Sequence, residues 1–289
     1  MGRHTTYLLL FALVGVFVFF APPENQFLVI LGALLSVILA VSGFYLNWLT
    51  LDGVPAATLV GTVSFGLGGL PMAGLLLIFF LSSSLISGLP LFRGDPPAPA
   101  SAEREERLRR RPPGREGRRT GSQVWANGFW LVLCLLLLHV TGEHLFTASA
   151  VAALAAATSD TWSTELGTHR MPGNTWSLTS LRPVPAGSDG GISLPGTLAG
   201  VAGSALLAGA GTWFYSLNLV WFFIIFSSGF LGCLFDSLLG ATSQDSLTLE
   251  FPMPFTERPW SLGIDNNTVN WLATGFASLW ALILNGIYL

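Results

Sequence analysis

The stretch AVAALAAATSDTWSTELG, residues 150–167, begins as a run of small apolar residues and ends with two carboxylates and several hydroxyl groups. Its first half suits a helix packed inside a membrane, because small residues let neighbouring helix backbones approach closely. Ionisable residues within membrane helices are costly and mark functional sites. The segment therefore predicts a membrane helix that leads into a site containing Asp160 and Glu165.

The composition of the whole chain agrees with a membrane protein. Of its 289 residues, 51% are hydrophobic and only 10% are charged, and the mean hydropathy is +0.61. A soluble domain carries about 25% charged residues. The chain contains no lysine, which excludes a lysine-dependent phosphate loop and Schiff-base chemistry.

We predict an all-α fold, a polytopic transmembrane helical bundle of about nine spans, because each run of roughly 20 apolar residues is long enough to cross a bilayer. We expect short or broken helices at the cytoplasmic site. The expected spans are residues 5–21, 27–46, 54–70, 72–91, 122–140, 144–160, 191–212, 216–240 and 268–288. The chain then divides into N-terminal transmembrane helices (1–92), an Arg/Pro-rich loop (93–121) and a transmembrane core with the candidate catalytic residues (122–289).

The arginines predict the orientation. Nine of the 13 basic residues lie between Arg93 and Arg119, and the positive-inside rule places such a loop in the cytoplasm. Counting spans outward from this loop puts the N-terminus in the cytoplasm. It also puts most polar residues at cytoplasmic helix ends, which favours a site on that side of the cell membrane.

The segment RRTGSQVWANG, residues 118–128, carries a possible polar face. Arg119, Gln123 and Asn127 are four residues apart and share one side of a helix. The guanidinium fork suits phosphate oxygens, and amides deep in a membrane need polar partners. Alternatively, Arg118 and Arg119 only anchor the helix at anionic lipid headgroups.

The opening segment contains two acids at a spacing that separates them. Asp160, Ser163 and Thr164 share a helical face, whereas Glu165 lies about 140° from Asp160 on a helix of about 100° per residue. Either the helix ends near Asp160, or the two acids have different roles. A carboxylate at a helix end suits Mg²⁺, which binds one or two carboxylates together with phosphates and water.

A second segment, GFLGCLFDSLLGATSQ at residues 229–244, resembles the first. It is an apolar run that leads to Asp236, then to hydroxyl and small residues. We interpret the two segments as a weak internal repeat of helical hairpins. Asp236 is then a second acid facing metal or phosphate, or simply a hydrogen-bonded aspartate inside the bundle.

Two further regions contribute candidate binding residues. The loop at 181–193 combines Arg182 with a glycine-rich turn, whose N–H groups and following helix N-terminus suit a phosphate. The last span begins with three asparagines, which either cap the helix or complete the polar site. The residues concerned are Asp189, Gly190, Gly191, Asn266, Asn267 and Asn270. By contrast, the region from Gly200 to Gly203 reads as a helix-packing face.

Taken together, these motifs resemble the integral membrane family that includes plant phytyl-phosphate kinase. The resemblance runs from about Asp52 to the C-terminus and is most specific at DTWSTELG. The family is similar in turn to CTP-dependent polyprenol and dolichol kinases, whose DxxAxxxG motif is echoed by Asp160, Ser163 and Gly167. The motifs that carry the resemblance to the phytyl-phosphate kinase family are GRRTGSQVWANG, AAATSDTWSTELG, GSDGGIS, GxxxDSLLGA and NNTVN.

The resemblance implies phosphoryl transfer from a nucleoside triphosphate, CTP in the related kinases, to an isoprenoid alcohol or monophosphate held among membrane lipids. By position, Asp160, Glu165 and Asp236 would manage Mg²⁺. The arginines at 118, 119 and 182 would hold phosphates, and Gln123 and Asn127 would line the pocket. No nucleic-acid partner is expected. The alternatives are a transporter of a small anion or lipid-linked phosphate, and a cytidylyltransferase that forms a CDP-lipid.

Overall fold

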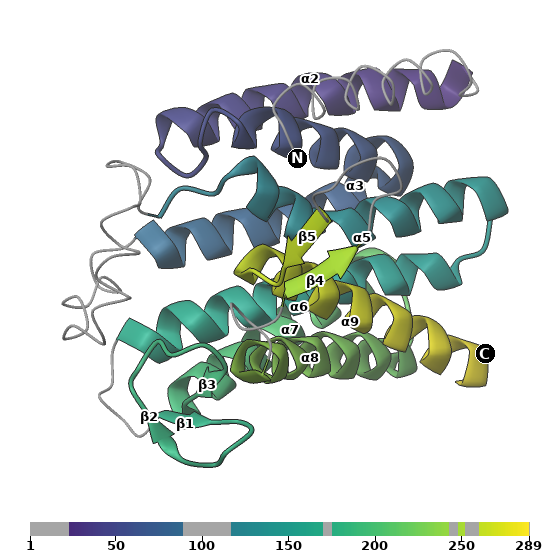
Figure 1. Ribbon diagram of the computed structural model, residues 1–289. Helices are drawn as coiled ribbons and strands as arrows, with labels where there is room; N and C mark the ends of the chain where they lie inside the picture. Colours follow the sequence, from purple (N-terminus) through teal and green to yellow (C-terminus); the bar gives the residue numbers. More distant parts are fainter. Residues whose placement is uncertain (1–22, 89–116, 170–174, 243–247, 252–259, 289) are drawn as a thin grey trace.

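The computed structural model describes residues 23–88, 117–169, 175–242, 248–251 and 260–288 (Figure 1). Within these ranges the chain is a helical bundle with two small antiparallel sheets. The helices are α2 (Pro23–Tyr45), α3 (Gly53–Gly88), α5 (Gly121–Thr141), α6 (Leu145–His169), α7 (Leu194–Phe214), α8 (Leu219–Thr242) and α9 (Asn266–Tyr288). The strands are β1 (Thr175–Ser177), β2 (Pro183–Val184), β3 (Gly191–Ile192), β4 (Thr248–Phe251) and β5 (Trp260–Gly263).

The predicted helical membrane fold is confirmed. Six helices in the described part of the chain are long and apolar enough to cross a membrane. The predicted span at 5–21 and most of the arginine-rich loop lie outside the described residues. The total of nine spans therefore stays a prediction.

Helix α3 is a hairpin of two arms. Gly69 breaks it with φ of 67° and ψ of −166°, a left-handed conformation that suits glycine, and Pro71 follows. Arg119 lies beside both outer ends of the hairpin: its carbonyl accepts from the Thr50 N–H at 3.0 Å, and its guanidinium donates to Ser84 Oγ at 2.9 Å. The two arms correspond to the predicted spans 54–70 and 72–91.

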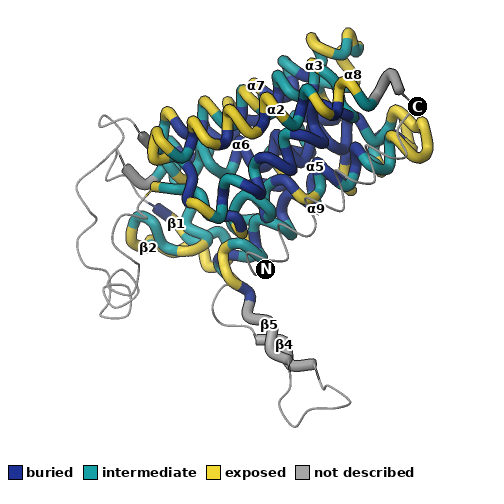
Figure 2. Tube along the Cα trace, turned by 90° about the horizontal axis from the view of Figure 1, so that it is seen from above, coloured by how far each residue is buried: buried dark blue, intermediate teal, exposed yellow. Residues whose placement is uncertain are grey.

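Helix α6 is the centre of the bundle. It contacts α3, α5, α7, α8 and α9, and its residues 151–154 have no exposed surface. Figure 2 shows the buried residues concentrated along the middle of the molecule. Alanine dominates this part of α6, and small side chains let the surrounding helices approach closely.

Glycines on the neighbouring helices complete this packing. A Cβ atom on Gly203 of α7 would lie 3.2 Å from the Thr158 carbonyl, and one on Gly232 of α8 would lie 2.8 Å from the Ala156 Cβ. The predicted packing face around Gly200 and Gly203 is confirmed.

This packing predicts a large effect of one added side chain. Gly232→Val is expected to lower the stability of the detergent-solubilised protein by about 1–3 kcal/mol or more, because the new methyl groups overpack α6. The control is Gly286→Val near the end of α9, where an added Cβ meets nothing within 4 Å. Thermal unfolding measures both variants, and equal midpoints for the two would contradict the packing described here.

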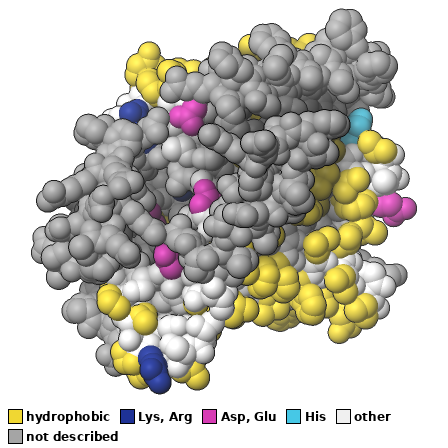
Figure 3. Space-filling model, in the orientation of Figure 1, with side chains coloured by type: hydrophobic (Ala, Val, Ile, Leu, Met, Phe, Trp, Pro, Cys, Tyr) yellow, Lys and Arg dark blue, Asp and Glu magenta, His cyan; other side chains and the backbone are white. Residues whose placement is uncertain are grey.

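The outer surface of the bundle is apolar. Phe27, Ile38, Leu198, Phe223 and Ile283 are each more than half exposed, at 67%, 60%, 59%, 57% and 52%. Figure 3 shows hydrophobic side chains gathered over the region of α8 and α9. Soluble monomers rarely expose large contiguous apolar patches, so these faces fit contact with lipid.

The helices at the candidate site differ from expectation in one respect. We predicted short or broken helices there, but α6 continues unbroken past Asp160 to His169, and α8 continues past Asp236 to Thr242. Close packing explains the continuation of α6, because a Cβ on Gly167 would lie 2.9 Å from the Gly196 Cα in α7. Among the described helices, the one that is interrupted is α3, at Gly69, which does not line the candidate site.

Candidate active site

A polar cleft lies where α6 and α8 end and α7 and α9 begin. We call it the acidic cleft, and it encloses about 700 Å³ open to solvent. The helices run antiparallel, so residues far apart in sequence meet at this end of the bundle. Its lining comprises Asp160, Ser163, Thr164, Gly167, Thr175, Gly187, Ser188, Asp189, Gly190, Gly191, Ser193, Gly196, Asp236, Ser237, Gly240 and Asn266.

Two aspartates from different helices meet in this cleft. Asp160 on α6 and Asp236 on α8 are close enough for their charges to interact. With its amide nitrogen turned towards the carboxylate, Asn270 of α9 donates to Asp236 Oδ2 at 3.0 Å. The Cys233 thiol lies beside both acids. Neighbouring carboxylates repel one another, so this pair favours a bound cation or a shared proton.

The donor set fits a magnesium ion. Among the described residues, no group of three or more His, Cys, Asp or Glu side chains is placed to hold a metal. Mg²⁺ uses one or two carboxylates and completes its shell with water and substrate phosphates. The described lining also includes no basic side chain that would neutralise the pair.

The opposite wall of the cleft suits an anion. The turn at 187–191 is held against the end of α8, because a Cβ on Gly190 would collide with backbone atoms of Ser237 and Ala241. Gly190 also has a φ of 68°, in the left-handed region that favours glycine. Beside it, Ser193 caps α7 by accepting from the Gly196 N–H at 3.3 Å, and a helix N-terminus attracts phosphate.

Glu165 faces a different part of the molecule. Ser87 of α3 donates to Glu165 Oε1 at 2.7 Å, and the carboxylate lies near enough to Arg119 to interact with it electrostatically. Because α6 is intact, Asp160 and Glu165 point to different sides of it. Of the three predicted metal ligands, Asp160 and Asp236 line the acidic cleft and Glu165 does not. The helix does not break near Asp160, so separate roles for Asp160 and Glu165 remain the prediction.

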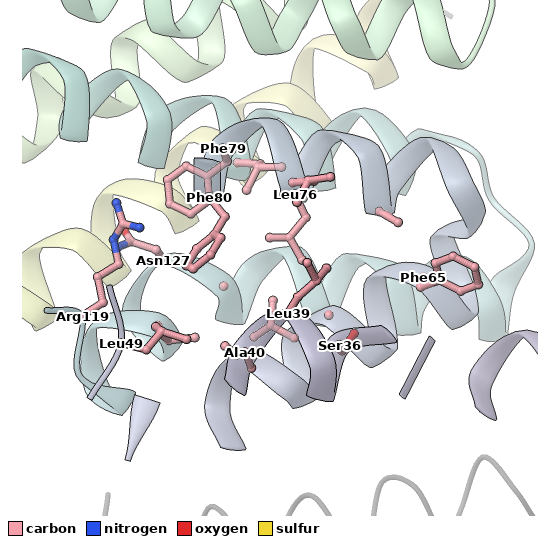
Figure 4. Close-up of a pocket in the computed structure, with 18 of the residues that line it drawn as sticks. Ser36, Leu39, Ala40, Leu49, Phe65, Leu76, Phe79, Phe80, Arg119 and Asn127 are labelled. Carbon is pink, nitrogen blue, oxygen red and sulfur yellow. The ribbon is translucent and has the colours of Figure 1, made fainter. Parts of the chain in front are cut away.

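Arg119, Gln123 and Asn127 line a second cavity, between α2, α3 and α5 (Figure 4). They share a face as predicted, but this face does not line the acidic cleft in the described structure. Gln123 also has a structural role, since its Oε1 accepts from the Thr120 N–H at 2.9 Å in a capping box. The Arg118 guanidinium donates to the Phe44 carbonyl at 2.9 Å and lies over the aromatic ring of Phe44.

Arg119 is buried, and its burial lowers the pKa of the guanidinium to about 10. The nearby Glu165 carboxylate acts in the other direction and raises this pKa. The residue therefore stays cationic at neutral pH. It is positioned by backbone bonds to Trp48 and Thr50, which join the start of α5 to the segment before α3.

The remaining predicted residues divide between the cleft and other positions. Arg182 is exposed next to β2 and is not among the residues that line the cleft. Asn266 lines the cleft, and Asn270 contacts Asp236, whereas the Asn267 amide lies 3.5 Å from Ser122 Oγ. The cap of α9 comes from Asp265, which accepts from the Thr268 N–H at 2.8 Å.

Several cleft residues were not identified from the sequence. Ser193 carried a usable signal, since a serine before Leu194-Pro195 is typical of a helix start. Ser237 directly follows Asp236. Thr175 and Ser188 carried no signal of their own, because only the folding of the 175–193 segment against α8 brings them to the cleft.

Comparison with known proteins assigns a family to this arrangement. A family model described as "Integral membrane protein DUF92" matches residues 34–278. The chain belongs to this family. The match confirms the resemblance inferred from the motifs, and with the apolar helices it establishes an integral membrane protein.

Proteins from a plant and from a cyanobacterium are similar to this chain. Protein VTE6, chloroplastic, of Arabidopsis thaliana is 25% identical over 242 residues, which cover 82% of this chain and 65% of that protein. Protein PGR of the same plant is 28% identical over 293 residues, which cover 86% of this chain and 93% of that protein. The uncharacterized membrane protein sll0875 of Synechocystis is 36% identical over 137 residues, 45% of this chain and 52% of that protein. The chain thus spans about half of the Synechocystis protein. No solved structure matches the chain.

Proposed function

We propose that this protein is a Mg²⁺-dependent kinase that transfers a phosphoryl group from CTP, or another nucleoside triphosphate, to an isoprenoid monophosphate or alcohol. The observation that carries the proposal is the acidic cleft, which Asp160 and Asp236 line together with a glycine-rich turn and a helix N-terminus. Membership of the family that the motifs identify as phytyl-phosphate kinase-like supports the same class of enzyme.

Asp160 and Asp236 would hold the Mg²⁺, and the turn at 187–191 with the start of α7 would bind phosphate oxygens through backbone N–H groups. The metal would supply charge neutralisation for the transferred phosphoryl group. Asn270 orients Asp236 through its hydrogen bond. Ser163 and Ser237 also line the cleft, and their hydroxyl groups would bind water or phosphate oxygens.

The chemistry needs few further groups from the protein. An oxygen of the lipid monophosphate attacks the γ-phosphorus, the bond from this phosphorus to the β–γ bridging oxygen breaks, and the nucleoside diphosphate leaves. A phosphate acceptor is already ionised, so no general base is needed for it. Phosphoryl transfer depends mainly on positioning and charge stabilisation, which the acids and backbone donors of the cleft provide.

The proposed location follows from the same arrangement. The cleft lies at the ends of apolar helices, so a water-soluble nucleotide can enter while the lipid tail stays between helices or in the bilayer. By the charge of the 93–119 segment, we place this end in the cytoplasm and the protein in the cell membrane.

The test is a label-transfer assay on the purified protein in detergent with Mg²⁺. CTP labelled at either the α- or the γ-phosphate is mixed with phytyl, farnesyl or geranylgeranyl monophosphate, and parallel reactions use ATP and GTP. The proposal predicts a lipid diphosphate that carries the γ label and not the α label. Transfer of the α label to the lipid would instead identify a cytidylyltransferase. Transfer from none of the nucleotides would contradict both enzymes and leave transport as the alternative.

A further inference from the structure

The second cavity is separate from the acidic cleft and shares none of its lining residues. It lies between α2, the two arms of α3, and α5, and takes in about 890 Å³, part of it open to the surroundings. Most of its lining is hydrocarbon, from residues such as Leu39, Leu76 and Phe80. Small residues, including Ala73 and Gly61, leave room between the helices. Figure 4 shows these side chains around an elongated space.

One end of this cavity is polar. Figure 4 places Arg119 and Asn127 together at that end, and Gln123 also lines the cavity. The Arg119 guanidinium lies over the Phe79 and Phe80 rings, with centroid distances of 5.5 and 5.8 Å. Its guanidinium donates to Ser84 Oγ at 2.9 Å and lies near the Glu165 carboxylate. A guanidinium has five N–H donors, and an anionic group at this end of the cavity would share them with Ser84 and Glu165.

The other end of the cavity is formed by Phe65. Figure 4 places this ring on the far side of the cavity from Arg119 and Asn127. Helix α2 packs directly against it, because a Cβ on Gly32 would lie 2.9 Å from the Phe65 Cβ. The next contact, between Gly66 and Val29, is equally close, with an added Cβ 2.8 Å from a Val29 methyl. The cavity therefore has one polar end and one aromatic end.

An occupant that fits is a molecule with an anionic head and a slender apolar tail. We propose that this cavity holds the isoprenoid tail of the lipid substrate and that Phe65 sets the longest tail accepted. The identity of the head group rests on the proposed function. Arg119 lies near Glu165 in the last turns of α6, the same end of the helix that carries Asp160. A lipid held here presents its head at the end of the bundle where the acidic cleft opens.

Two substitutions test the tail site from opposite directions. Phe65→Ala deepens the cavity and is expected to shift the ratio of kcat/KM for geranylgeranyl over farnesyl monophosphate by about tenfold towards the longer tail, the discrimination that a few methylene groups give in an apolar pocket. Ala73→Leu narrows the cavity and is expected to shift the same ratio towards the shorter tail. The controls are Phe223→Ala and Ala202→Leu, at exposed positions that do not line the cavity.

A binding measurement separates this inference from the proposed function. Prenyl monophosphates of increasing length are titrated into the protein without nucleotide and followed by native mass spectrometry. If no nucleotide supports turnover, yet binding depends on tail length and both cavity variants shift that dependence, the tail site stands and the kinase proposal fails. If turnover occurs but neither variant changes the length preference, the tail site is overturned. Absence of prenyl monophosphate binding to the wild-type protein also overturns it.

Discussion

Replacing Asp236 by asparagine is expected to lower kcat by about 10²- to 10³-fold, since a metal-bound carboxylate supports several kcal/mol of charge stabilisation and each 1.36 kcal/mol is about tenfold in rate. The same loss is expected for Asp160→Asn, because the two acids face one cleft from different helices. The exchange preserves side-chain size, so both variants should fold. Glu143→Gln is the matched control, at an exposed carboxylate in the α5–α6 turn.

The metal role of Asp236 can also be tested by thermal unfolding with and without Mg²⁺. Removing one charge of the Asp160–Asp236 pair relieves their repulsion, so Asp236→Asn is expected to melt at an equal or higher temperature than the wild type in EDTA. Adding Mg²⁺ with a non-hydrolysable CTP analogue should stabilise the wild type by ligand binding but not the variant. Full activity and full Mg²⁺ stabilisation in the variant would refute the metal role of Asp236.

Gly190→Ala is the second substitution with a large expected effect. An alanine at a φ of 68° is strained by about 1–2 kcal/mol, and its Cβ would collide with the backbone of Ser237 and Ala241. The turn must then move away from α8, which separates the phosphate-binding backbone from Asp236. We expect the KM for the nucleotide to rise at least about tenfold, because the loss of roughly one charge-assisted hydrogen bond weakens binding by that factor.

A matched control separates backbone strain from displacement of the turn. Gly142 also has a left-handed φ, 73°, but an added Cβ there meets nothing within 4 Å, and it lies between α5 and α6 away from the cleft. Gly142→Ala should lower stability slightly and leave the nucleotide KM unchanged. Equal KM values for Gly190→Ala and the wild type would show that the 187–191 turn does not bind the nucleotide.

Helical periodicity predicted much of the site. The spacing from Asp160 to Glu165 indicated different faces, and α6 places the first in the acidic cleft and the second beside Ser87. The ladder of Arg119, Gln123 and Asn127 likewise lines one cavity. Periodicity gives the face of a helix but not the neighbour that this face meets. For that reason the sequence grouped the ladder with the two aspartates, whereas the structure places it in the second cavity.

Loops and helix ends were harder to predict, because their positions depend on tertiary contacts. Arg182 was grouped with the glycine-rich turn by proximity in sequence, but the β2–β1–β3 sheet leaves it exposed outside the cleft lining. These strands have two or three residues, too few to show an alternating pattern. The asparagines at 266–270 were expected either to cap α9 or to complete the polar site. The capping side chain belongs to Asp265, whereas Asn266 lines the cleft and Asn270 contacts Asp236.

Asp160 and Asp236 together are proposed to bind a divalent cation beside the turn at 187–191. The most direct measurement is Mn²⁺ binding by electron paramagnetic resonance, with and without a non-hydrolysable CTP analogue, for the wild type, Asp160→Asn, Asp236→Asn and Glu143→Gln. We predict stoichiometric binding that the analogue tightens in the wild type and in Glu143→Gln, and loss of that binding in each aspartate variant. Undiminished Mn²⁺ binding in both aspartate variants would contradict the account.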